Sequence, residues 1–191
     1  GAFISGDFTK VGNFDRNGLA HINSNGQVTA LDIAINGSVY DIMLDLENDV
    51  LYIGGEFSEV NGVVRENLCA LNSGTFDVLP FDPLLNGPVY DIEQESGILY
   101  LAGGFTGAGE LAKEFLIYNE VTEEALAPFV ANGDITDVVE DGNGGFFLLG
   151  NFTTVGDSLR NAIAHVDSEG QPTDWNVNLE AASPLSYTGV N

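Results

Sequence analysis

The chain has 191 residues, of which 44% are hydrophobic, and this is enough apolar material to bury a sizeable core. Acidic residues number 29 against five Lys and Arg, which gives a formal net charge of −24. A surface this negative repels phosphate backbones and anionic lipid headgroups, so the composition argues against nucleic acid as a partner and against membrane insertion. The single cysteine, Cys69, excludes a disulfide within the chain and a cysteine-rich zinc site, and we expect it to be a small buried thiol.

Four copies of one repeat fill the sequence. Each copy opens with an apolar run that ends in Gly-x-Phe, and the closing phenylalanines are 49, 48 and 47 residues apart. They are Phe8, Phe57, Phe105 and Phe152, and we expect all four to be buried at equivalent positions. The spacing predicts a single domain over 1–191, with repeats at approximately 1–50, 51–98, 99–145 and 146–191.

Further segments follow each phenylalanine in a fixed order, and the second copy shows them best. A Val-Asn-Gly turn at 60–62 precedes a short strand over 68–72. A segment with one large residue, Phe81, comes next, and Asn86-Gly87 then leads into another strand over 88–92. Short strands separated by Gly, Asn and Asp turns, without helical periodicity, are typical of antiparallel sheets.

The fold class that this pattern favours is all-β, and specifically a β-propeller of four-stranded antiparallel blades. One sheet cannot bury both of its faces alone, so neighbouring blades must stack around an axis. A parallel β-helix is the alternative, but its coils are usually shorter and lack hairpin turns. We place the innermost strand of a blade at Val39–Leu44 and at the equivalent residues of the other repeats. With this assignment, about four blades are present. They form either a complete small ring or, as we slightly favour, a fragment of a larger one.

The motifs of the second copy resemble those of a known family. Its segments 51–57, 60–62, 68–72 and 87–90, together with Arg65, are similar to the delta-sixty β-propeller repeat of bacteria. The third copy departs from the pattern, because Ala112 stands at the Arg position. The resemblance implies a propeller fold and a bacterial extracellular or cell-surface location in a longer multi-domain protein. It implies no activity, since most of that family has no known function.

Three aspartates on the innermost strands are the candidate ligand-binding residues. Asp41, Asp91 and Asp137 occupy one repeat position, and we expect them to form a ring of carboxylates around the propeller axis. Carboxylates about 9 Å apart repel each other by roughly 2 kcal/mol at an effective dielectric near 20, so they require donors or cations. Arg16, Arg65 and Arg160 also share a repeat position. We predict that each makes a charge-assisted contact with an acidic or carbonyl oxygen of its own or an adjacent blade, and these aspartates are the favoured partners.

Calcium is the one cofactor that the sequence suggests, because acidic turns follow the innermost strands. The candidate ligands are Asp45, Glu47, Asp49, Asp141 and Asn143. Their spacing is not that of an EF-hand loop, and we favour structural hydrogen bonding over metal binding.

Residues that recur at one repeat position are more plausibly structural than catalytic. His21 and His165 are equivalent, which argues against a catalytic or metal-binding pair. Trp175 aligns with Phe81 and Phe129, so we interpret it as a blade filler rather than as a platform for a sugar, which is the alternative. No nucleophile elbow, phosphate loop or zinc motif is present.

The sequence thus favours a non-catalytic extracellular module that binds a protein or a glycan at its propeller face. The alternative is a carbohydrate-binding or carbohydrate-active propeller that uses acids and aromatic residues such as Trp175, Tyr40 and Tyr90 around one mouth. Two of the 29 acids would suffice as a catalytic pair.

Overall fold

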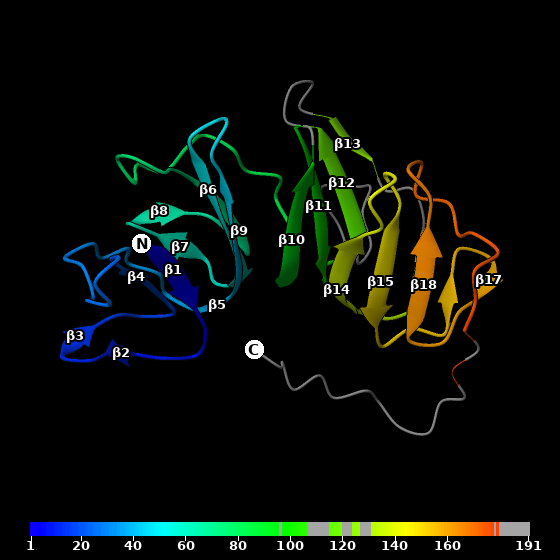
Figure 1. Cartoon of the computed structure of the whole chain (residues 1–191), viewed down its shortest axis with the longest axis horizontal. Helices are drawn as coiled ribbons and strands as arrows, with labels where there is room; N and C mark the ends of the chain where they lie inside the picture. The colour runs from blue at the N-terminus through cyan, green and yellow to red at the C-terminus, as the bar shows by residue number, and fades with distance from the viewer. Residues whose placement is uncertain (96, 107–114, 120–123, 127–130, 178, 180–191) are drawn as a thin grey trace.

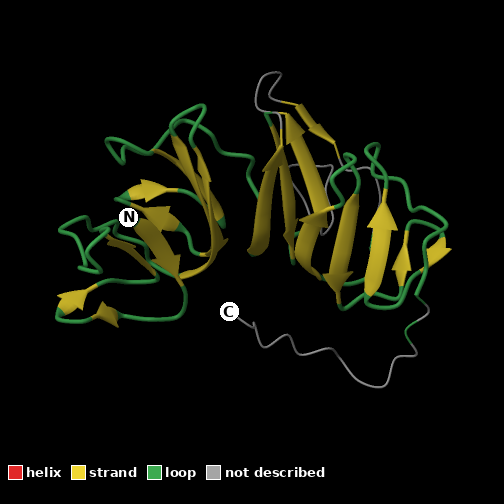
Figure 2. Cartoon of the chain, viewed as in Figure 1, coloured by secondary structure: helices red, strands yellow, loops and turns green. Residues whose placement is uncertain are grey.

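The computed structural model describes residues 1–95, 97–106, 115–119, 124–126, 131–177 and 179. These residues form antiparallel strands and loops and contain no helix, as Figure 2 shows. They therefore hold no helix long and apolar enough to cross a membrane. The all-β prediction is confirmed.

Four sheets follow one another along the chain (Figure 1). The first contains β1 (Ala2–Ser5) and β4 (Leu19–Ile22). The second is ordered β5 (Ser38–Asp45), β6 (Val50–Glu56), β9 (Leu68–Asn72). The third is β10 (Val89–Glu95), β11 (Ile98–Gly103), β12 (Phe115–Asn119), β13 (Glu124–Leu126), and the fourth is β14 (Ile135–Glu140), β15 (Phe146–Gly150), β18 (Ile163–Val166).

The predicted innermost strand, Val39–Leu44, lies within β5. β5, β10 and β14 each lie at one edge of their sheet and contact each other in sequence, β5 with β10 and β10 with β14. We call these three the inner strands.

A two-stranded hairpin adjoins three of the sheets. The hairpins are β2 (Lys10–Val11) with β3 (Phe14–Asp15), β7 (Glu59–Val60) with β8 (Val63–Val64), and β16 (Thr154–Val155) with β17 (Ser158–Leu159). In the middle one, Asn61 and Gly62 turn the chain with φ angles of 51° and 80°, which is the geometry that Asn-Gly pairs favour in tight hairpins. The predicted Val-Gly turns are the tips of these hairpins.

The predicted four-stranded sheets are found only in part. Among the described residues, only the third sheet has four strands. In the other sheets a single bridge takes the place of the fourth strand: Ile22 with Val28, Leu71 with Val78, and Val166 with Pro172. Because Pro172 has no N–H, it cannot extend its bridge into a regular ladder.

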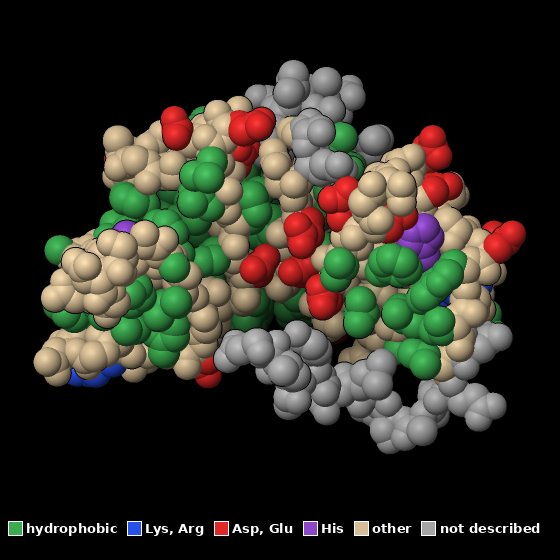
Figure 3. Space-filling view, in the orientation of Figure 1, with side chains coloured by type: hydrophobic (Ala, Val, Ile, Leu, Met, Phe, Trp, Pro, Cys, Tyr) green, Lys and Arg blue, Asp and Glu red, His purple; other side chains and the backbone are tan. Residues whose placement is uncertain are grey.

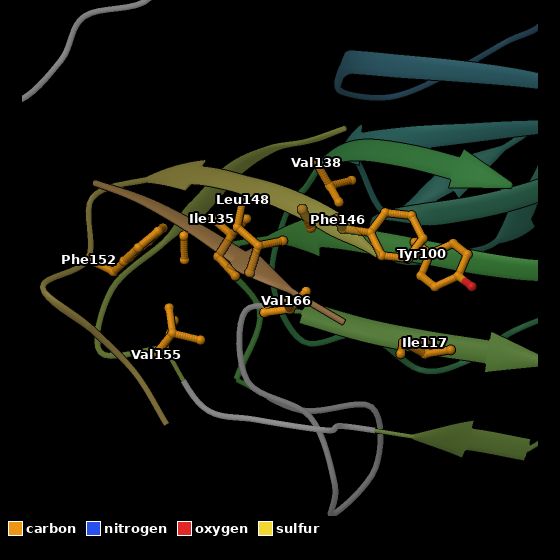
Figure 4. Packing of buried hydrophobic residues seen from close by; sticks show 12 residues of the cluster. Tyr100, Ile117, Ile135, Val138, Phe146, Leu148, Phe152, Val155 and Val166 are labelled. Atoms are coloured by element: carbon orange, nitrogen blue, oxygen red, sulfur yellow. The ribbon is translucent and has the colours of Figure 1, made fainter. Parts of the chain in front are cut away.

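Three hydrophobic clusters lie between consecutive sheets. The cluster between the third and fourth sheets joins Tyr100 and Ile117 to Ile135, Phe146 and their neighbours, as Figure 4 shows. Equivalent clusters join the second sheet to the third and the first to the second. Each sheet therefore buries its face against the next sheet along the chain.

The repeated phenylalanines pack toward the preceding sheet. Phe57, Phe105 and Phe152 are buried, and each belongs to the cluster shared with the sheet before its own. Phe8 is only half-buried, so its predicted burial is wrong. The reason is geometric, because no sheet among the described residues precedes the first one.

The Asn-Gly pairs anchor the start of each inner strand. The side-chain oxygen of Asn36 accepts hydrogen bonds from the N–H groups of Ser58 and Glu59, at 2.9 Å each. Asn86 and Asn132 make equivalent bonds in the third and fourth sheets. The glycine that follows is required by close packing, since a Cβ on Gly37 would overlap the carbonyl oxygen of Glu56.

Candidate functional site

A bulge in each inner strand directs the predicted aspartates out of the sheet. The pairing register shifts between Val39 and Asp41 in β5, and it shifts at the equivalent places in β10 and β14. The extra residues are Tyr40, Tyr90 and Thr136. A bulge lets two successive side chains face the same region, and bulges are common beside binding sites.

Two of the aspartates link consecutive sheets. The Asp41 carboxylate accepts a hydrogen bond from the N–H of Ile92, with Oδ2 at 2.9 Å from the nitrogen. The Asp91 carboxylate accepts one from Val138 in the same way, at 2.8 Å. In both cases the donor follows the aspartate of the next inner strand. The repeated aspartate thus satisfies a backbone N–H group of the next inner strand.

Burial and mutual repulsion disfavour the charged form of these carboxyl groups. Burial, together with the nearby carboxyls of Asp41 and Asp137, raises the pKa of Asp91 to about 7, although the hydrogen bond from the Val138 N–H acts in the opposite direction. Burial likewise raises the pKa of Asp41 and of Asp137 above their ordinary values. The three groups form one interacting set, and their charges are not independent.

A cavity of about 620 Å³ opens beside this set. Its lining comes from the inner strands and from the ends of the fourth sheet: Tyr40, Asp41, Tyr90, Asp91, Thr136, Asp137, Leu149, Gly150, Asn151 and Ala162. The rings of Tyr40 and Tyr90 lie 5.6 Å apart, and Tyr40 is 43% exposed. Acidic side chains gather in the middle of this face of the molecule, over β10 and β14 (Figure 3).

The arginines make the predicted contacts with carbonyl oxygens, but the favoured pairing with the three aspartates is wrong. Each arginine instead uses its guanidinium to bind backbone carbonyl groups of its own sheet. Arg16 donates to Thr29 O at 2.9 Å and Arg65 donates to Leu79 O at 2.9 Å, while Arg160 donates to Thr173 O. The carboxylates nearest to the first two are Asp32 at 3.7 Å and Asp82 at 3.8 Å. The arginines therefore stabilise the part of these three sheets that lies at the opposite end of the strand order from the inner strand.

The predicted calcium ligands close turns. Asp45 is buried and accepts hydrogen bonds from the N–H groups of Glu47 and Asn48, and also from the side chains of Asn48 and Gln94. Burial raises its pKa, but these hydrogen bonds together hold that pKa below the ordinary value. Asp141 accepts in the same way from the N–H groups of Asn143 and Gly145. Asp49 takes a turn conformation with φ 57°. Within the part of the chain that the structure describes, no three acidic, His or Cys side chains cluster around a common point.

The two histidines are equivalent, as the repeat predicts. The Nδ1 atom of His21 lies 3.3 Å from the hydroxyl of Thr29, and that of His165 lies 2.9 Å from Thr173. One further contact could not be inferred from the repeat: His165 Nε2 lies 2.8 Å from Asp141 Oδ2. The hydrogen bonds from Asn143 and then from His165 lower the pKa of Asp141.

Trp175 lies away from the cavity. Its ring packs edge-on against Phe147 at 5.1 Å, as Phe81 packs against Tyr52 in the second sheet at 5.7 Å. The ring pair at this repeat position supports the interpretation of Trp175 as a filler. Cys69 is buried and unpaired, as predicted.

Comparison with known proteins identifies no family. No family model matches the chain, and a search of curated proteins finds no significant relative.

Proposed function

We propose that this chain is a β-propeller module that binds a partner without chemical change at the face formed by its inner strands. The single observation that carries the proposal is the cavity of about 620 Å³ lined by Tyr40, Asp41, Tyr90 and Asp91. The propeller architecture is supported by the serial packing of the sheets and by the aspartate hydrogen bonds that repeat from one inner strand to the next.

The chemistry of the face favours a positively charged group on the partner. Burial raises the pKa of the three carboxyls, which means that it disfavours their charged form. A positively charged neighbour favours that charged form again, so a cation on the partner would stabilise these carboxylates. Tyr40 and Tyr90 supply ring faces, which attract a Lys or Arg side chain by about 0.5–2 kcal/mol. The net charge of −24 also speeds the approach of a basic partner. The proposed partner is therefore a basic segment of a protein.

The alternative is a carbohydrate ligand. It has one observation in its favour, which is that a tilted pair of tyrosine rings beside carboxylates can hold a sugar ring by stacking and hydroxyl hydrogen bonds. An extracellular or cell-surface location, implied by the resemblance to the delta-sixty repeat, is compatible with both ligands and remains part of the proposal.

Binding measurements on two ligand sets distinguish these possibilities. An array of basic peptides and an array of glycans would be probed with the wild type, with the double variant Y40A/Y90A and with L159A, whose side chain is 63% exposed and lies outside the cavity. We expect binding to basic peptides that weakens with salt, is lost in Y40A/Y90A and persists in L159A. Glycan binding or hydrolysis that depends on the two tyrosines would instead assign the carbohydrate function.

A further inference from the structure

Asparagines followed by glycine occur at seven places in this chain: Asn17, Asn25, Asn36, Asn61, Asn86, Asn132 and Asn143. In such a pair the glycine nitrogen can attack the side-chain amide carbon of the asparagine, because glycine has no Cβ to hinder the approach. The attack requires a side-chain amide that is free to rotate and a glycine N–H that is free to lose its proton. Hydrogen bonds to either group therefore slow the reaction.

Three of these asparagines share one repeat position, shortly before an inner strand: Asn36, Asn86 and Asn132. Each side-chain oxygen accepts a hydrogen bond from at least one backbone N–H. Each side-chain nitrogen also donates to a hydroxyl oxygen, at 2.8, 3.1 and 2.7 Å respectively. A Cβ on the glycine that follows would overlap a backbone carbonyl oxygen in all three cases. These pairs are therefore held on both sides of the reacting bond.

Three further pairs have hydrogen bonds at one of the two reacting groups. The N–H groups of Gly18 and Gly26, which would attack Asn17 and Asn25, each donate to a backbone carbonyl, at 2.9 and 3.0 Å. The side-chain oxygen of Asn61 accepts from a backbone N–H at 2.9 Å, and its side-chain nitrogen donates to a backbone carbonyl at 3.3 Å. At least one hydrogen bond must therefore break before any of these pairs can react.

The seventh pair, in the turn between β14 and β15, leaves both reacting groups accessible. Asn143 is exposed, and its side-chain nitrogen reaches Asp141 O only at the long distance of 3.4 Å. Over the described residues, its side-chain oxygen accepts no hydrogen bond and the N–H of Gly144 donates none. Gly142 and Gly144 flank Asn143 with φ angles of 79° and 84°, and a Cβ on Gly142 would meet no atom within 4 Å. The turn therefore has room for the reaction.

The same turn carries the contact between Asp141 and His165. The N–H of Asn143 donates to Asp141 Oδ1 at 2.7 Å, while Asp141 Oδ2 lies 2.8 Å from His165 Nε2. A carboxylate at position 143 would repel the Asp141 carboxylate. In isoaspartate the main chain also runs through the former side-chain carbon, which lengthens the turn. Both changes disturb the position of Asp141 beside His165.

We propose that Asn143 is a site of spontaneous modification, at which attack by Gly144 N yields aspartate and isoaspartate and weakens the contact between Asp141 and His165. The bond from Gly144 N to Cγ forms, and the Cγ–Nδ2 bond breaks. The proton of the glycine nitrogen passes through solvent to the departing amide nitrogen, which leaves as ammonia. Water then adds to either carbonyl of the succinimide ring, and the bond from that carbonyl to Gly144 N breaks. No oxidant or reductant is required.

Peptide mapping of the full chain measures the reaction. The protein is incubated in mildly alkaline buffer, both folded and in urea, and is then digested with a protease that cleaves after glutamate. The digest places Asn143 in the fragment 141–169 and its control Asn132 in the fragment 126–140. Tandem mass spectrometry then follows the replacement of each amide by a carboxyl group. We expect Asn143 to react at least tenfold faster than Asn132 in the folded protein and within about threefold of it in urea, where the hydrogen bonds are absent.

Thermal melts measure the consequence. Modified protein, separated by anion exchange, should melt at a lower temperature than unmodified protein. This difference should disappear in H165A, which has already lost the contact with Asp141, and it should persist in H21A, the equivalent change in the first sheet. Equal rates at Asn143 and Asn132 in the folded protein, or no reaction at Asn143, would overturn the site. A difference in melting temperature that is the same in H165A and in H21A would overturn the effect on His165.

Discussion

Replacing Asp91 by asparagine should stabilise the protein at alkaline pH. Burial raises the pKa of this carboxyl from an ordinary 3.8 to about 7, so the folded state binds the proton more tightly than the unfolded state does. A group of this kind contributes stability at low pH and loses that contribution as the pH rises from about 4 to about 7. Asparagine carries no charge at any of these pH values, and its side-chain oxygen still accepts a hydrogen bond from the N–H of Val138.

The expected magnitude follows from the pKa. One pKa unit corresponds to about 1.4 kcal/mol. Above pH 7 the full shift would therefore lower the free energy of unfolding of the wild type by at most about 4 kcal/mol. Asp91 is only partly buried and shares its titration with Asp41 and Asp137, so we halve this figure. D91N should then be more stable than the wild type by about 2 kcal/mol at pH 8. The difference should shrink by roughly 1–2 kcal/mol at pH 5, where the folded wild type holds the proton.

Urea denaturation at the two pH values measures this difference, and D157N is the control because Asp157 is an exposed residue that undergoes the same change. D157N corrects for the general relief of negative charge. A D91N protein that is less stable than the wild type at pH 8 would refute the reasoning, because it would mean that a charged Asp91 stabilises the fold.

Three further predictions concern the repeated residues. R65A should lower the free energy of unfolding by about 2–3 kcal/mol in urea titrations, because the side chain is 14% exposed and its loss leaves the part-buried carbonyl oxygen of Leu79 without this donor; a loss below about 0.5 kcal/mol would contradict this role. F105L should cost about 1–3 kcal/mol and F8L clearly less, since only Phe105 is fully enclosed by two sheets; thermal melts that show equal losses would count against the packing described above. The double variant H21Q/H165Q should bind basic peptides like the wild type, and loss of binding would show that the histidines are functional.

The sequence was sufficient to predict what is repeated within a sheet. The strand positions, the turn tips such as Asn61-Gly62, the burial of Cys69 and the equivalence of the two histidines could all be inferred, because each depends on local pattern and register. The position of the inner strand could also be inferred from the Asn-Gly pair that precedes it.

Contacts between elements could not be inferred in the same way. The sequence could show that Asp41 and Arg16 recur, but not that a bulge at Tyr40 directs the aspartate to the next inner strand. A contact of the arginine with an acidic or carbonyl oxygen was predicted and is present, but the favoured partner was wrong. Charge scarcity suggests a carboxylate, whereas the guanidinium of Arg16 reaches the carbonyl of Thr29, 13 residues along the chain. The contact between His165 and Asp141 has no counterpart at His21, so the repeat gave no signal for it.

The cavity beside the inner strands was foreseen as a set of aspartates and, in the carbohydrate alternative, as aromatic side chains that include Tyr40 and Tyr90. The bulges that place these two tyrosines beside the aspartates could not be inferred. The bulge turns Tyr40 toward solvent, and a bulge is a feature of pairing register that residue types alone do not reveal.

A crystal structure of the chain is the most direct test of the propeller proposal. We expect the consecutive sheets to be related by one nearly constant rotation about a common axis. The carboxylates of Asp41 and Asp91 should lie within hydrogen-bonding distance of the N–H groups of Ile92 and Val138, around an open cavity. Sheets that pack face to face in two layers, with the aspartates directed away from the neighbouring strands, would contradict the propeller and the binding face proposed on it.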